Sequence, residues 1–251
     1  NEDTSISFNP TANDTDADGT IDATTVDLDV LTNGIQQNAI TAEGSWTVNA
    51  SGVVTFTPTL NYNGIATRAY TVKDNAGVAS NGILMTITVI SVNDNPVASN
   101  DAGTTQEDVI LLLPVITSND TDVDGTVDAS TVDLDPGVAG RQTAVSTAQG
   151  SWSVDASANL SYTPTVNFNG TATINYTVAD NAGGVSNSAT ITVTVTPVND
   201  APTAVDDSAS TFEDTPVSLP DITSNDTDVD GSIDKTTVDL DPVAPGQQQT
   251  V

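Results

Sequence analysis

The residues best placed to do chemistry are the carboxylates of an acidic loop that occurs three times. Its second copy has Asp120, Asp122 and Asp124 at alternate positions before Gly125, and Asp128 follows four residues after Asp124. Carboxylates at this spacing can converge on one cation, because the glycine lets the backbone fold over the ion and the ninth position can bind directly or through water. The pattern is the start of an EF-hand-style loop that lacks the bidentate glutamate at its twelfth position.

All three loops are candidate calcium sites. Without a cation, carboxylates about 5 Å apart repel by roughly 3 kcal/mol at an effective dielectric of about 20. Calcium is favoured over magnesium because magnesium retains its waters, whereas an all-protein oxygen cage suits the larger ion. The alternative is that these side chains form Asx turns in a solvated loop, but three copies with one spacing favour calcium. The candidate ligands are Asp14, Asp16, Asp18, Asp22, Asp120, Asp122, Asp124, Asp128, Asp226, Asp228, Asp230 and Asp234.

The composition excludes several classes of function. The 251 residues contain 30 Asp and 4 Glu against 2 Lys and 2 Arg, and the net charge of -30 excludes nucleic acid as a partner. The excess of Asp over Glu indicates short carboxylates in tight loops, with an acidic anti-aggregation surface as the alternative. The chain has no Cys and no His, which removes disulfides, thiolate metal sites and imidazole catalysis. We therefore expect no enzyme activity, and no apolar run is long enough for a transmembrane segment.

A repeat of 106 residues organises the whole chain. The acidic loop begins at Asn13, Asn119 and Asn225, and TVDLD, GSW and YTVxDNAG return at the same offset. A period this long indicates whole domains in series. We expect the first repeat to lack its opening strand, and residues from about Asp207 onward to be poorly stable unless more chain follows. The predicted domains are 1–95, 96–201 and 202–251.

Within each repeat, apolar residues alternate with a period of two. Ala189, Ile191, Val193 and Val195 share one face of a segment whose other face is threonine, as in a half-buried antiparallel strand. About seven such runs per repeat are separated by Asn, Asp, Gly and Pro. The sequence therefore predicts an all-β chain of tandem antiparallel β-sandwich domains of the Ig-like or cadherin-like kind.

A second acidic constellation lies at the predicted domain junctions. The strings VNDNP (92–96) and VNDAP (198–202) end successive repeats, and Glu-Asp pairs follow at 107–108 and 213–214. Asn-Asp-x-Pro is also a plain linker and turn sequence. That reading is the alternative to a metal site at each junction.

These junction motifs resemble the interdomain linkers of cadherins and of cadherin-like bacterial repeats. The whole unit is similar to modules of very long tandem-repeat adhesins of Gram-negative bacteria, including gliding and biofilm adhesins of the Bacteroidetes type. The resemblance implies that calcium is held between the linker, a first-strand glutamate and an Asp near the end of a late strand, which stiffens successive domains. The ligands that it implies are Asp74, Asn93, Asp94 and Glu107 at one junction, and Asp180, Asn199, Asp200 and Glu213 at the next.

Two functions follow from these features. The first is a calcium-stabilised stalk of a bacterial adhesin, extracellular and associated with the outer membrane, whose partners are its neighbouring repeats and an unknown surface glycan or protein. The second is an array of carbohydrate-binding modules in a secreted protein; a third possibility is a connector in a secreted enzyme or S-layer protein. Trp46 and Trp152 occupy equivalent positions in successive repeats, which predicts core packing, with a sugar-stacking platform as the alternative. Buried rings favour the stalk, and exposed rings favour the carbohydrate-binding array.

Overall fold

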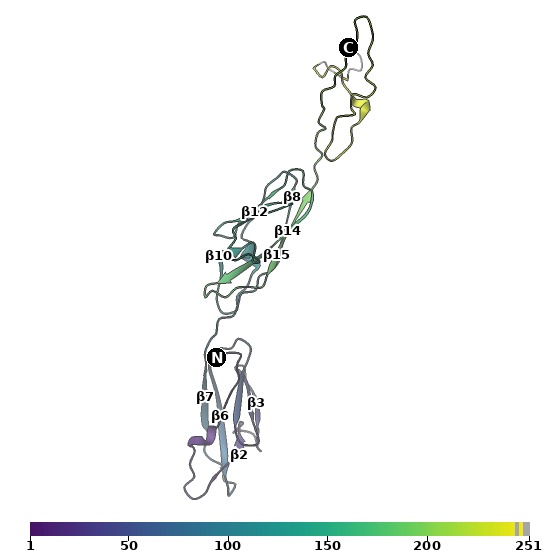
Figure 1. Ribbon diagram of the computed structural model, residues 1–251. Coiled ribbons are helices and arrows are strands. Elements are labelled where there is room, and N and C mark those ends of the chain that lie inside the picture. Colours follow the sequence, from purple (N-terminus) through teal and green to yellow (C-terminus); the bar gives the residue numbers. More distant parts are fainter. Residues whose placement is uncertain (244–245, 248–251) are drawn as a thin grey trace. The chain divides into compact units, whose positions relative to one another are not determined.

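The chain is almost entirely β (Figure 1) in the computed structural model, which describes residues 1–243 and 246–247. This confirms the predicted all-β class. The strands of the first repeat are β1 (Ile6–Phe8), β2 (Ile21–Asp27), β3 (Asn38–Ile40), β4 (Gly44–Val48), β5 (Val54–Pro58), β6 (Gly64–Asp74) and β7 (Ile83–Val89). Those of the second are β8 (Asp101–Gln106), β9 (Leu111–Leu113), β10 (Val127–Asp133), β11 (Ala144–Thr147), β12 (Gly150–Val154), β13 (Leu160–Pro164), β14 (Gly170–Asp180) and β15 (Ala189–Thr196). Short 3-10 helices occur at η1 (Pro10–Asn13), η2 (Ile116–Asn119) and η3 (Lys235–Thr237).

The first repeat forms two antiparallel sheets, in the orders β1-β5-β4-β3 and β2-β6-β7. Both sheets contribute to one core, in which Val26 of β2 and Trp46 of β4 are fully buried. Trp46 lies opposite Phe56 in the β4–β5 ladder, and their ring centroids are 4.5 Å apart. Trp46 is therefore a core residue, as its position in the repeat predicts.

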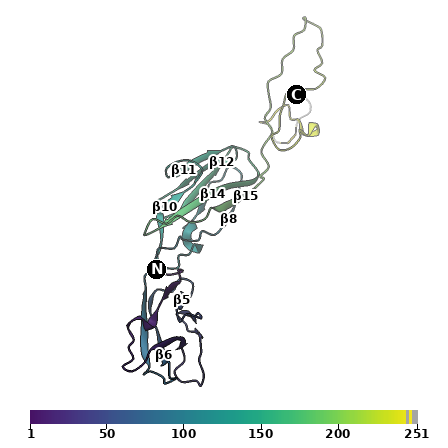
Figure 2. The same ribbon diagram turned by 60° about the horizontal axis from the view of Figure 1, so that its bottom comes forward.

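The second repeat has the orders β11-β12-β13-β9 and β10-β14-β15-β8, and β14 lies beside β15 in both views (Figures 1 and 2). The predicted alternation along β15 is confirmed, since its apolar positions are buried and its threonines are more exposed. Trp152 is 1 % exposed and packs against Tyr162 at 4.2 Å between ring centroids. One pairing departs from the antiparallel pattern, because β8 runs parallel to β15.

The repeated TVDLD motif closes a turn. The Oδ1 atom of Asp27 accepts hydrogen bonds from the backbone N–H groups of Asp29 and Gln36, each at 3.0 Å. Asp133 makes the equivalent contacts in the second repeat. These aspartates therefore hold a loop together as Asx-turn residues do.

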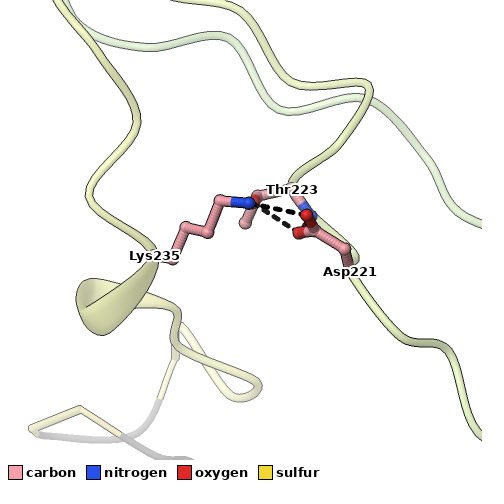
Figure 3. A network of polar contacts seen from close by, with 3 residues as sticks. All are labelled: Asp221, Thr223 and Lys235. Atoms are coloured by element: carbon pink, nitrogen blue, oxygen red, sulfur yellow. Dashed lines mark hydrogen bonds and ion pairs between the residues drawn. The ribbon is translucent and has the colours of Figure 1, made fainter.

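The third repeat shows no strand among its described residues, and residues 244–245 and 248–251 lie outside the described part. Backbone hydrogen bonds join Thr203 and Thr227 in an isolated bridge. The Lys235 ammonium lies 2.6 Å from Asp221 Oδ2, and Thr223 donates to the same carboxylate (Figure 3). The hydrogen bond from Lys235 lowers the pKa of Asp221, but an exposed pair of this kind contributes little to stability.

Contacts divide the chain into two units that do not follow the repeat boundaries predicted from sequence. The first unit comprises residues 1–97, 121–127 and 179–186, and the second comprises 98–120, 128–178 and 187–251. Two loops of the second repeat join the first unit because they contact the linker at 93–97; for example, Val97 N–H donates to Thr121 O at 2.7 Å. Within the described residues, no helix has the length and apolar character needed to cross a membrane.

Candidate metal centre

Three acidic side chains from separate segments meet in the first unit. Glu2 precedes β1, Asp94 belongs to the linker, and Asp124 belongs to the second acidic loop. One carboxylate oxygen from each lies within 4.8 Å of the others. Oxygen atoms at this separation can share one hard cation.

Glu2 is fixed by the end of the β7 segment. Its backbone N–H donates to Ile90 O at 2.9 Å, and its Oε1 accepts from the N–H of Val92. Asp3 follows in the left-handed region with φ of 55°, and its Oδ1 accepts from Asn61 N–H at 2.9 Å. Glu2 is only 3 % exposed, so the backbone holds a buried carboxylate beside the linker.

The linker is fastened to two loops of the second repeat. Asp94 N–H donates to Asp124 Oδ1 at 3.3 Å, and Asn93 Nδ2 donates to Asp180 Oδ2 at 2.7 Å. Asp180 is 3 % exposed, and its other oxygen accepts from Ala182 and Gly184. The hydrogen bond from Asn93 and those backbone bonds lower the pKa of Asp180, so this carboxylate stays ionised.

Several oxygens of the centre have no hydrogen-bond donor. Glu2 Oε2, Asp94 Oδ2 and Asp122 Oδ2 are buried without a partner among the described residues. Desolvation, followed by the negative charges of Asp124, Asp3, Glu2 and Asp122, raises the pKa of Asp94. Buried unpartnered carboxylate oxygens are costly, and an all-oxygen donor set of this kind fits calcium.

The second unit contains an equivalent cluster around Asp200. The N–H of Val198 donates to Glu107, which is 4 % exposed, and Asp200 N–H donates to Asp230 at 3.4 Å. Burial and then the charges of Asp230, Glu107, Asp108 and Asp228 raise the pKa of Asp200, whose Oδ2 is buried without a partner. The contacts between linker, glutamate and acidic loop therefore recur, whereas among the described residues three carboxylate oxygens within 4.8 Å of one another occur only at Glu2, Asp94 and Asp124.

The grouping differs from the one that the resemblance implies. Glu107 lies with Asp200 and not with Asp94, and Asn93 pairs with Asp180 in place of Asp74. Asp74 lies opposite Ile21 in the β2–β6 ladder, beside the first acidic loop. The reason is that each linker meets the glutamate of the repeat before it and the loops of the repeat after it. Among the remaining candidates, Asn199 Nδ2 donates to the backbone O of Asp200, and Glu213 is exposed.

The positions within each acidic loop also differ in their contacts. The first position accepts hydrogen bonds from outside the loop: Asp14 and Asp120 accept from the hydroxyls of Tyr70 and Tyr176, and Asp226 accepts from Val205 N–H. The ninth position caps a turn through the residue two places later, in Asp22, Asp128 and Asp234. The third position accepts from amides of its own loop, in Asp16, Asp122 and Asp228. The fifth position, Asp18, Asp124 or Asp230, is exposed, and the latter two reach the linker.

Glu2 and Asp3 were not predicted from the sequence. They correspond to Glu107 and Asp108 at an offset of 105, because the second repeat has one more residue between this pair and its acidic loop. The strand registers confirm the alignment, since Ile6 pairs with Phe56 as Leu111 pairs with Tyr162. An alignment that allows a gap of one residue would have found the pair.

Comparison with known proteins agrees with the repeated motifs. Residues 93–197 match the family described as bacterial cadherin-like domain, and residues 1–88 match the family described as bacterial Ig domain. A search of curated proteins found no match.

Similar solved structures include cadherins and an enzyme. Chicken VE-cadherin EC1-2 is 17% identical, with 60% of this chain and 77% of that chain covered and a TM-score of 0.32. The human desmocollin-1 ectodomain is 15% identical, with 74% and 40% covered and a TM-score of 0.28. The endo-fucoidan hydrolase MfFcnA4 is 20% identical, with 64% and 23% covered and a TM-score of 0.26. Scores this low carry no argument about function.

The two family matches set the general character of the chain. Cadherin-like domains generally bind calcium, and bacterial cadherin-like and Ig-like domains are typically non-enzymatic parts of extracellular or surface proteins. Tandem domains of this type also imply contacts between neighbouring repeats. Residues 1–88 therefore resemble a bacterial Ig domain, and residues 93–197 resemble a bacterial cadherin-like domain.

Proposed function

We propose that this chain is part of a calcium-stabilised tandem-repeat stalk of a bacterial surface adhesin. The observation that carries the proposal is the meeting of Glu2, Asp94 and Asp124, which come from three separate segments and lie within 4.8 Å of one another. A solvated acidic surface does not require such convergence. It also does not require buried carboxylate oxygens without donors.

The residues that would hold calcium are those of the two clusters. Glu2, Asp94, Asp122 and Asp124 would bind one ion in the first unit. Glu107, Asp200, Asp228 and Asp230 would bind another in the second unit. The bound ion supplies the positive charge that these oxygens lack.

The same side chains would couple calcium binding to the position of the linker. Without a cation, the carboxylates repel one another and push the linker away from the acidic loop and from Glu2. With that repulsion removed, the hydrogen bonds of Asp94 to Asp124 and of Asn93 to Asp180 hold the linker in place. Extracellular modules bind calcium at about 0.1 to 1 mM, so the repeats would be stiffened after export.

An adhesin stalk also agrees with the tryptophans. Trp46 and Trp152 are buried in the cores, so neither ring can stack on a sugar, and their burial favours the stalk over a carbohydrate-binding array. The proposed domains remain 1–95, 96–201 and 202–251, and we propose no catalytic activity for them. Such a stalk would be attached to the outer membrane and would act in gliding or in biofilm formation.

Thermal unfolding with calcium and with excess chelator tests the calcium dependence. At a free calcium concentration 100 times the dissociation constant, binding to the folded state adds about 2.7 kcal/mol per site, so we expect a clearly higher midpoint. Magnesium at the same concentration is the control and should raise the midpoint less. An unchanged midpoint on calcium removal would contradict the proposal.

A further inference from the structure

Strand β9 forms one edge of the sheet β11-β12-β13-β9 in the second repeat. It pairs with β13, where Leu112 lies opposite Ser161, and within the described residues no strand pairs with its other side. The preceding strand β8 leaves this edge open because it runs parallel to β15 in the other sheet. Chain precedes and follows the second repeat in the sequence, so the open edge is a property of the fold of this repeat. Such an edge directs backbone N–H and C=O groups toward solvent.

The side chains along this edge are apolar and exposed. Leu112 is 71 % exposed, and Ile110 and Val109, which precede the strand, are 56 % and 50 % exposed. Val115, just beyond the strand, is 39 % exposed. One exposed apolar side chain is ordinary, whereas a group of them marks an interaction surface. We call these four side chains the β9 patch.

The other two repeats have polar residues or proline at the positions of the β9 patch. The β1–β5 and β9–β13 registers align Ser7 with Leu112, and Ser218 lies 106 residues after Leu112 in the third repeat. The fold of a repeat therefore does not require apolar side chains at this edge, and the β9 patch is specific to the second repeat. The full set of equivalents is Thr4, Ser5, Ser7 and Asn9 in the first repeat, and Thr215, Pro216, Ser218 and Asp221 in the third.

Val115 also has a strained backbone. Its φ of 44° and ψ of 70° lie in the left-handed region, where a β-branched residue is an outlier. Asn9, at the same position before η1, has a φ of -93°, and its side chain accepts a hydrogen bond from Thr11 N–H. Val115 makes no side-chain cap before η2. Backbone strain of this kind clusters at functional sites, so the valine indicates a role other than stability.

A groove of about 690 Å³ opens beside Leu112. Its lining is apolar on the β9 side, at Leu113 and Pro114, and polar on the β12–β13 side, at Ser153 and Ser161. A groove of this size can accept apolar side chains of another chain. The free backbone groups of β9 lie beside it and could hold that chain in an extended conformation.

The charges that border the β9 patch are negative. Residues 109–119 carry no charge, and Asp108 and Asp120 stand at the two ends of this run. Asp155 lines the groove, and hydrogen bonds from the Asn159 side chain and from backbone amides lower the pKa of Asp155, so it stays ionised. A partner that complements this surface is therefore apolar in its middle and basic at its ends.

We propose that the β9 edge binds an extended segment of a partner protein as an added strand, with apolar residues in the middle of that segment and Lys or Arg at its ends. Backbone hydrogen bonds to β9 would hold the segment, and its apolar side chains would contact the β9 patch and the groove. The β9 patch contains no residue of either acidic cluster, so this inference does not depend on calcium.

A second copy of this chain fits the β9 edge less well than a short segment does. A stable interface buries about 800 Å² per partner, which is more than a strand of three residues and four side chains provide. Each copy also carries a net charge of -30, which opposes the approach of two copies.

Fluorescence anisotropy of a labelled synthetic peptide, titrated with the whole chain, tests the proposal. The probe is the peptide KVLVLK, which is apolar in its middle and basic at its ends. We expect saturable binding that weakens at higher salt, because salt screens the charges at its ends. The peptide EVLVLE has the same middle and acidic ends, and it should bind at least about tenfold more weakly. Equal binding of the two peptides would contradict the proposed charge complementarity.

Leu112→Ser tests the apolar contact, because it introduces the residue found in the other two repeats. It should weaken binding of KVLVLK by about tenfold. The unfolding midpoint should change little, since the leucine is exposed. Val138→Ser, at another exposed apolar position of the same repeat, is the matched control and should bind KVLVLK as the wild type does.

Hydrogen exchange locates the bound peptide. The amides of residues 110–113 should gain protection when KVLVLK is added to the wild type, and should gain much less in Leu112→Ser. The proposal is overturned by the absence of saturable binding, or by a Leu112→Ser variant that binds KVLVLK as tightly as the wild type. Protection that appears only outside residues 110–113 would also overturn it, because the peptide would then bind elsewhere.

Discussion

The first and second acidic loops have nearly the same sequence but different surroundings. The second loop is covered by the linker, whose Asp94 N–H donates to Asp124. At the first loop the equivalent of Asp180 is Asp74, whose side chain accepts hydrogen bonds from amides of its own turn, Ala76 and Val78. The comparison teaches that the loop motif supplies part of a metal centre, and that the linker and a distant glutamate supply the rest.

A single residue marks this difference. Gly184 stands beside the second loop, and a Cβ there would lie 2.6 Å from both Asn95 Oδ1 and Asp180 Oδ2. Val78 occupies the same position beside the first loop and is 65 % exposed. A valine cannot accept the linker in the geometry seen at the second loop.

The largest effect is expected for Gly184→Val, which places at the second loop the side chain that stands at the first. The new side chain would displace the linker asparagines, and overpacking of this kind costs about 1–3 kcal/mol. We expect a lower unfolding midpoint in calcium and a smaller gain on calcium addition, both measured by calorimetry. Val78→Gly is the control, and a change there as large as that of Gly184→Val would contradict the difference between the loops.

A smaller effect is expected from charge removal at equivalent positions. Asp124→Asn removes one of the three converging carboxylates, so calcium affinity measured by titration calorimetry should fall about tenfold, which corresponds to 1.4 kcal/mol. In chelator the same variant should unfold at a higher temperature, because Asp94 loses a like-charged neighbour. Asp18→Asn changes the exposed counterpart and should alter affinity by roughly twofold or less. Equal losses in both variants would mean that the loops bind alike.

The smallest effect concerns the buried tyrosines beside the two loops and Asp101, an aspartate that faces one of them. Burial and the neighbouring carboxylates raise the pKa of Tyr70, which hydrogen-bonds Asp14, to about 12. Tyr176 faces two carboxylates, and its pKa is raised further. Burial, together with the charge of Asp120, raises the pKa of Asp101 to about 6. Asp101 thus binds a proton more readily in the folded state than in the unfolded state.

Stability without calcium should therefore rise as pH falls from 7 through about 6 toward 3.8, because the folded state takes up the proton first. Asp101→Asn should remove this contribution. Its midpoint should exceed that of the wild type at pH 7, by on the order of a few degrees given the partial exposure, and the gap should close below pH 4. Thermal scans at each pH measure this difference, and a gap that is constant with pH would contradict the assignment to Asp101.

The sequence by itself determined the period, the strand pattern and the core. Alternation along residues 189–195 predicted a strand with one buried face, and the equivalent positions of Trp46 and Trp152 predicted core packing. It also identified the acidic loops, because turn chemistry depends on residues close together in the chain. These features are local, or they repeat along the chain, so they can be identified from the sequence alone.

Only the tertiary structure decided which carboxylates meet. Loop spacing cannot tell that Asp14 accepts from Tyr70 while Asp124 faces Asp94, because those partners are about 30 to 60 residues away and are brought close by sheet pairing and by the linker. It also could not show the parallel pairing of β8 with β15. A metal centre shared between segments depends on long-range geometry, and the spacing of residues within one loop does not fix that geometry.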